Sequence, residues 1–145
     1  MDLSQEIRKD FNAQLVFMSG QKVPSTSNVR FHRKRTAILG SLIFLADLAE
    51  KNGLTTLFDF LIAEINNVRN VLEPSFKEDW AHNNGDIEKV NVIFLCDITE
   101  GYNAARENYL KFDVILPVKI PTGGCSTNPE LKKVINKLIT KLIGE

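Results

Sequence analysis

Apolar residues follow two patterns along the chain: short, nearly continuous runs, and longer stretches in which they recur every three or four positions. The continuous runs cover Leu15–Met18, Val90–Cys96 and Asp113–Val118. A short apolar run bounded by turn residues is typical of a strand that is buried on both faces, as in a parallel sheet. We therefore predict that Leu15–Met18, Val92–Cys96 and Val114–Val118 are parallel strands of one sheet.

The stretches with a period of three to four predict amphipathic helices. One begins near Arg30 and ends near the Asn52-Gly53 pair, which commonly caps a helix C-terminus. The next covers residues 55–72, although the pattern leaves open a short strand at residues 56–60. Further helices are expected over residues 2–12, from Gly101 to about Leu110, and from Pro129 to Leu142.

Helices that alternate with strands over short links predict an α/β fold, a three-layer domain with a mainly parallel sheet. The chain has 145 residues, which fits one Rossmann-like domain over residues 1–145. Hydrophobic residues make up 43% and charged residues 25%, as in ordinary globular proteins, so a disordered chain is disfavoured.

The charge balance excludes several classes of partner. Lys plus Arg is 18 and Asp plus Glu is 18, so the basic excess of a nucleic-acid-coating protein is missing.

The N-terminus lacks a secretory pattern, and no apolar run approaches the ~18 residues of a membrane span. Two cysteines make no disulfide framework, and no His/Cys/Asp spacing is typical of zinc. We expect a cytoplasmic protein without membrane or nucleic-acid partners and without a metal.

The loop at residues 121–127 is the most informative candidate for chemistry. It follows a predicted strand and opens a predicted helix. Two glycines let backbone N–H groups approach an anion, the hydroxyls add donors, and the helix N-terminus adds positive potential. The loop is thus a candidate phosphate cradle, and the alternative is a tight left-handed turn before a helix. The cradle residues are Thr122, Gly123, Gly124, Ser126 and Thr127.

This loop resembles the P-G-G-x-G-T-x-x-E motif of the LOG (lysine decarboxylase-like) family and the wider SLOG superfamily. Gly123, Gly124, Thr127 and Glu130 match, whereas Thr122 and Ser126 depart from the motif. The run that ends in Ser19-Gly20 also resembles the first strand of that superfamily. The resemblance implies a Rossmann-like fold and a nucleotide-derived ligand. LOG enzymes cleave the N-glycosidic bond of nucleoside monophosphates, and their motif Glu would correspond to Glu130.

A second group of polar residues follows the predicted central strand. Ligands of open parallel sheets bind beyond the carboxyl ends of the strands, which selects Ser19, Gly20, Asp97, Glu100 and Tyr102 together with the 121–127 loop. Asp97 is a candidate for ribose binding or for acid–base catalysis beside Glu130. Tyr102 is a candidate for stacking on a base. The alternative is that Asp97 or Thr99 caps the next helix.

Three functional hypotheses follow from these residues. The first is a small nucleotide-binding module, a sensor or sequestering protein, which needs no cofactor and forms a homo-oligomer. The second is a LOG-like N-glycosidase, a phosphoribohydrolase acting on a nucleoside phosphate. The third is a non-catalytic protein-interaction module, which would expose an apolar patch.

Overall fold

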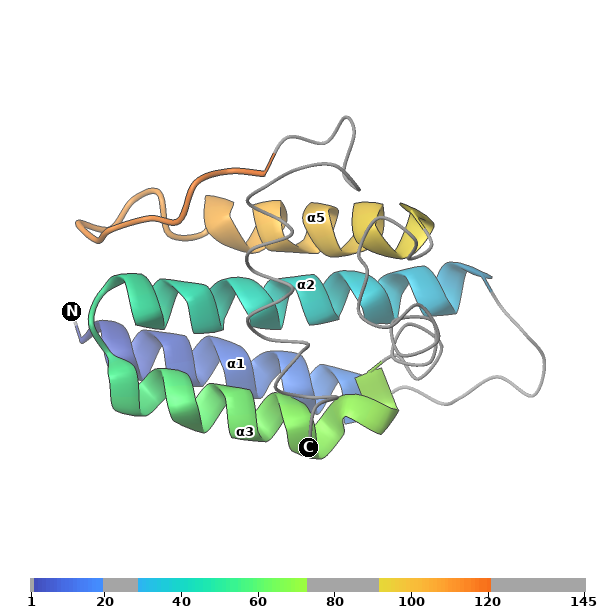
Figure 1. Cartoon of the computed structure of the whole chain (residues 1–145), viewed down its shortest axis with the longest axis horizontal. Helices are drawn as coiled ribbons and strands as arrows, with labels where there is room; N and C mark the ends of the chain where they lie inside the picture. The colour runs from blue at the N-terminus through green and yellow to red at the C-terminus, as the bar shows by residue number, and fades with distance from the viewer. Residues whose placement is uncertain (1, 20–28, 73–91, 121–145) are drawn as a thin grey trace.

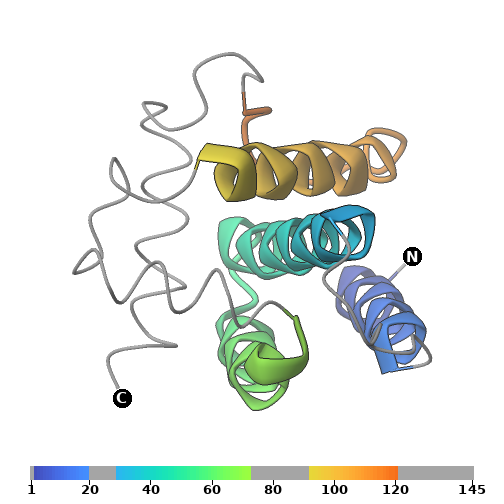
Figure 2. The same cartoon turned by 90° about the vertical axis from the view of Figure 1, so that its right-hand side faces the viewer.

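The computed structural model describes residues 2–19, 29–72 and 92–120. These ranges form a helical bundle and contain no strand, so the prediction of a Rossmann-like α/β domain with a parallel sheet is wrong. The helices lie roughly side by side, with α2 between α5 and the pair α1 and α3 (Figures 1 and 2). Their bounds are α1 Leu3–Ser19, α2 Val29–Lys51, α3 Thr55–Leu72 and α5 Val92–Glu107.

The central helix α2 contacts each of the other three helices. Every residue from Leu42 to Ala49 is buried, so this part of α2 has no solvent-facing side. A helix that is apolar all round is stable only when neighbours cover it on all sides. Apart from Asp47, residues 42–49 are apolar all round, which fits the place of α2 in the middle of the bundle and differs from the single apolar face that the sequence pattern predicts (Figure 2).

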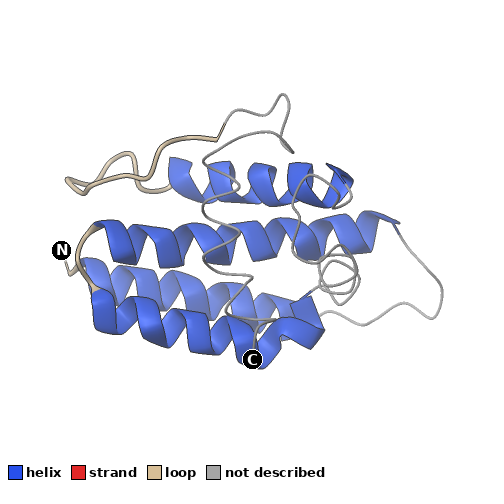
Figure 3. Ribbon diagram, in the orientation of Figure 1, coloured by secondary structure: helices blue, strands red, loops and turns tan. Residues whose placement is uncertain are grey.

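None of the three predicted strands is a strand in the described residues. Residues 15–18 are the last full turn of α1, because Leu3, Ile7, Phe11 and Leu15 continue a spacing of four against the core. Residues 92–96 are the first turns of α5, and residues 115–120 form neither helix nor strand (Figure 3). An apolar run of four to seven residues fits a buried helix as well as a buried strand, so the pattern did not decide between them.

The predicted helices over residues 2–12 and from Gly101 are parts of the longer helices α1 and α5, and the one from Pro129 to Leu142 lies outside the described residues. The other two helix predictions are confirmed with their bounds. Helix α2 ends at Lys51, and Gly53 follows with a φ of 74°, the left-handed conformation that favours glycine. The Leu54 N–H donates to the Ala49 carbonyl at 2.9 Å and the Gly53 N–H donates to the Glu50 carbonyl at 3.1 Å, which makes a Schellman cap. Helix α3 then occupies residues 55–72, and the alternative strand at 56–60 is absent.

Glycines on α2 and α5 bring the two helix backbones into close contact. A Cβ atom on Gly40 would fall on the Ile98 carbonyl, and a Cβ on Gly101 would fall on the Ala37 carbonyl. At each glycine, the backbone of the other helix thus occupies the space that a side chain would fill. This approach is possible only for residues without a side chain.

The segment after α5 turns back along the bundle and is held by side chains (Figure 1). The Asn52 amide exchanges two hydrogen bonds of 2.9 Å with the Ile115 backbone. Arg106 Nε donates to the Pro117 carbonyl at 2.8 Å. The buried Asn103 amide exchanges bonds of 2.7 and 3.0 Å with the Ile120 backbone. Side-chain amides thus supply the hydrogen bonds that a neighbouring strand would supply in a sheet.

Candidate functional site

Four of the predicted site residues lie in described helices. Ser19 is the last residue of α1, whereas Asp97, Glu100 and Tyr102 lie on α5, where Asp97 is buried and Glu100 is exposed. Thr99 is buried inside α5 and is not a helix cap. Because residues 2–19, 29–72 and 92–120 contain no strand, the sheet-edge rule that grouped these residues with the 121–127 loop does not apply to them.

Tyr102 belongs to the core of the bundle. Its side chain is buried, its hydroxyl donates to Asp47 Oδ2 at 2.7 Å, and its ring meets Phe44 edge to face with centroids 5.3 Å apart. The bond satisfies a carboxylate that is itself buried on α2. A ring enclosed in this way has no open face on which a base could stack.

The remaining predicted site residues lie outside the described part of the chain. They are Gly20, Thr122, Gly123, Gly124, Ser126, Thr127 and Glu130. The phosphate cradle and a catalytic role for Glu130 therefore stay predictions from the sequence.

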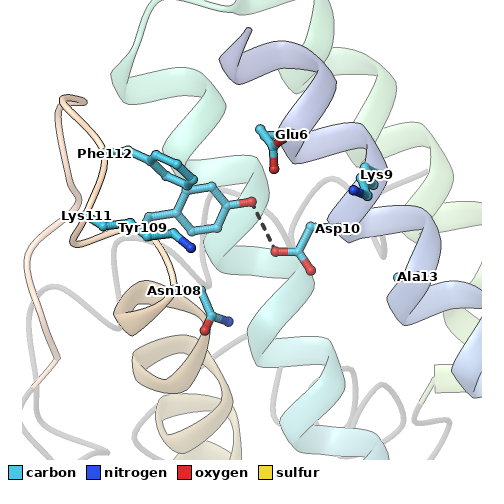
Figure 4. Close-up of a pocket in the computed structure, with 8 residues that line it drawn as sticks. All are labelled: Glu6, Lys9, Asp10, Ala13, Asn108, Tyr109, Lys111 and Phe112. Atoms are coloured by element: carbon cyan, nitrogen blue, oxygen red, sulfur yellow. Dashed lines mark hydrogen bonds between the residues drawn. The ribbon is translucent and has the colours of Figure 1, made fainter. Parts of the chain in front are cut away.

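A different site appears between α1 and the turn that follows α5. It is an open cleft of about 370 Å³ (Figure 4). We call it the α1–α5 cleft, and its lining residues are Glu6, Lys9, Asp10, Ala13, Asn108, Tyr109, Lys111 and Phe112. The α1 residues lie on successive turns of one helix face, because spacings of three and four place side chains side by side.

A tyrosine and an aspartate join the two walls of the cleft. The Tyr109 hydroxyl donates to Asp10 Oδ2 at 3.0 Å (Figure 4). Burial raises the pKa of Tyr109 above its usual value, and the charge and hydrogen bond of Asp10 and the charge of Glu6 raise it further. The two carboxylates thus create a negative potential at the phenol oxygen.

Aromatic rings form the other side of the cleft. The Tyr109 and Phe112 rings lie with centroids 5.5 Å apart, and Tyr109 also packs on the buried Phe44 at 5.8 Å. The Lys111 ammonium lies 5.3 Å from the centre of the Phe112 ring, within the range of a cation–π contact. The cleft therefore combines rings held by the core with carboxylates of α1.

Sequence reasoning did not find this site. Asp10 and Tyr109 are 99 positions apart, and no motif links them. The only local signal was Glu6 and Asp10, four residues apart on one face of a predicted helix. That signal alone is common on exposed helices and does not indicate a cleft.

Neither the family models, nor the curated proteins, nor the solved structures contain a match to this chain. Within residues 2–19, 29–72 and 92–120, no group of three His, Cys, Asp or Glu residues is placed to hold a metal ion. Over the same ranges, no helix has the length and apolar character that a membrane crossing requires. The site must therefore be interpreted from its own geometry.

Proposed function

We propose that the chain is a non-catalytic protein-interaction module and that its α1–α5 cleft receives an arginine or lysine side chain of a partner protein. The observation that carries this proposal is the partly exposed Phe112 ring beside the carboxylates of Glu6 and Asp10, with the buried Tyr109 holding both the Phe112 ring and Asp10 in place. Aromatic faces and carboxylates are the two kinds of group that attract an organic cation.

The cleft already places one cation against its aromatic side. Lys111 holds its ammonium near the Phe112 ring, and this contact would be exchanged when a ligand cation enters. A guanidinium suits the site better than an ammonium, since it can stack on a ring and donate in parallel to a carboxylate. Lys9 and Lys111 at the cleft would favour a partner segment that also carries an acidic residue.

The described residues do not support the nucleotide hypothesis. Its geometry required strands that end beside the 121–127 loop, and two of those strands are parts of α1 and α5. The homo-oligomer expected from the sequence would form through a surface other than the α1–α5 cleft.

A matched pair of peptides tests the proposal. Acetyl-Gly-Arg-Gly-amide should shift the NMR signals of Tyr109 and Phe112, whereas the citrulline peptide, which has the same shape without charge, should not. Asp10→Asn should weaken binding about tenfold, because a hydrogen bond to a charged group is lost. Lys111→Met should strengthen it about threefold, because the competing cation is removed.

Asp59→Asn is the control, since it removes the same charge from an exposed position on α3, outside the cleft. It should leave the affinity unchanged. Equal binding of the arginine and citrulline peptides would contradict the proposal. So would the absence of any shift at about 1 mM arginine peptide, a regime near −4 kcal/mol.

A further inference from the structure

We define the 113–119 segment as Asp113 to Lys119, with the sequence Asp-Val-Ile-Leu-Pro-Val-Lys. Its charged residues stand symmetrically at its two ends. An acidic residue stands at one end, a basic residue at the other, and apolar residues lie between. Both charged ends are exposed. Ile115 and Val118 are 62% and 64% exposed, unusually high values for large apolar side chains with the bundle beside them.

One edge of this segment is held by the bundle. Asn52 bonds both backbone groups of Ile115, and Arg106 bonds the carbonyl of Pro117. Successive residues of an extended chain direct their N–H and C=O groups to opposite edges. The backbone groups of Leu116 therefore lie on the edge that faces away from Asn52 and Arg106.

That outer edge offers hydrogen-bonding groups. Among the described residues, no hydrogen bond reaches the backbone of Leu116 or Val118, while the Val114 N–H donates locally to the Phe112 carbonyl at 3.1 Å. An extended edge with exposed apolar side chains is a template for another strand. Pro117, which has no N–H, lies on the inner edge, where it interrupts no outer hydrogen bond.

We propose that the outer edge pairs with the same segment of a second copy of this chain. The pairing is antiparallel and centred on Leu116, which makes the interface two-fold symmetric. The two Leu116 residues exchange both backbone hydrogen bonds.

The charges select this occupant and this register. With Leu116 opposite Leu116, Asp113, in the turn just before the paired residues of one copy, lies near Lys119 just after those of the other, so both ends of the pairing carry opposite charges. Opposite charges that meet across an antiparallel pair are favourable, and like charges there are unfavourable. A shift of register would separate these charges and place apolar residues opposite charged ones.

Charge exchange in the full chain tests the proposal, with sedimentation equilibrium over about 10 µM to 1 mM as the readout. Asp113→Lys places Lys opposite Lys at both ends of the pairing, and Lys119→Asp places Asp opposite Asp. Each should raise the dissociation constant of the dimer about tenfold. The double variant D113K/K119D should restore it to within about threefold of the original.

A mixture of the two single variants is the decisive control. In a mixed dimer the introduced lysine of one copy lies opposite the introduced aspartate of the other, and the original Lys119 lies opposite the original Asp113. Association should therefore return, although neither variant alone associates well. This recovery also shows that both variants are folded. Hydrogen exchange at the Leu116 amide should slow as the protein concentration rises.

Two results would overturn the proposal. One is a protein that stays monomeric throughout this concentration range. The other is a dimer whose dissociation constant is the same for the single variants, the double variant and the mixture. Because neither Asp113 nor Lys119 lines the α1–α5 cleft, failure here would leave peptide binding at that cleft unaffected.

Discussion

Two tyrosine hydroxyls donate hydrogen bonds to carboxylates that are wholly or partly buried in this bundle. Tyr102 donates to the buried Asp47, and Tyr109 donates to the half-buried Asp10. In each case a residue on or just after α5 satisfies a carboxylate on another helix. A buried carboxylate that loses its donor costs more than the bond itself contributed, because the group is left without its hydration.

Removal of the Tyr102 hydroxyl should therefore be costly. We expect Tyr102→Phe to lower the free energy of unfolding by about 1–3 kcal/mol, since it leaves the ring packed but deprives Asp47 of its donor. Urea denaturation followed by circular dichroism measures the change. Glu100→Gln, an exposed change two positions away on α5, should stay within about 0.5 kcal/mol. A Tyr102→Phe variant as stable as the original would contradict the role assigned to this bond.

The ionisation of Tyr109 gives a pH dependence with a definite sign. Its pKa is raised on folding, so the group contributes stability that is complete below the unfolded value of about 10 and is lost as the pH rises through the folded-state pKa. The measurement is a ¹³Cζ-tyrosine NMR titration, with Tyr102→Phe to assign the signal. Asp10→Asn should bring the pKa of Tyr109 down toward 10. Titration of Tyr109 at its usual pKa in the original chain would show that the contact with Asp10 is not formed.

At the scale of elements, the α2–α5 interface depends on two residues that contribute no side chain. At Gly40 and Gly101, the backbone of the opposite helix lies where a Cβ atom would be. Packed helices that approach so closely cannot absorb an added group by small rotations, because interiors have few voids.

Gly101→Val should push α5 away from α2 and lower the free energy of unfolding by more than about 3 kcal/mol. Gly53→Ala is the matched comparison, because a Cβ there meets open space and strains only the left-handed backbone. It should cost about 1–2 kcal/mol. Thermal unfolding of both variants separates the two causes, and equal losses would argue against the close helix contact.

At the scale of the whole molecule, the described helices share one core around α2. Leu42 is fully buried in that core, whereas Leu110 is 51% exposed after α5. Because α1, α3 and α5 each pack on the same central helix, they are expected to unfold together.

Leu42→Ala should lower the free energy of unfolding by about 2–5 kcal/mol, and helix content and near-ultraviolet tyrosine signals should be lost in one shared transition. Leu110→Ala should change it by less than about 1 kcal/mol, since its side chain is largely in water. Separate transitions for the two signals would mean that α5, which carries Tyr102, is not part of the same cooperative unit.

The sequence by itself determined α2 and its C-terminal cap, because periodicity and a glycine after Asn52 are local signals that neighbours need not complete. For α3 it left a strand at residues 56–60 open, and the structure decided for the helix. Only the tertiary structure decided that Leu15–Met18 and residues 92–96 are helical. Short apolar runs satisfy either a helix or a strand, and here they continue helices whose buried residues, such as Phe11 and Ile98, belong to the shared core. The bonds of Asn52 to Ile115 and of Tyr109 to Asp10 join residues 63 and 99 positions apart, so they exist only once the chain has packed.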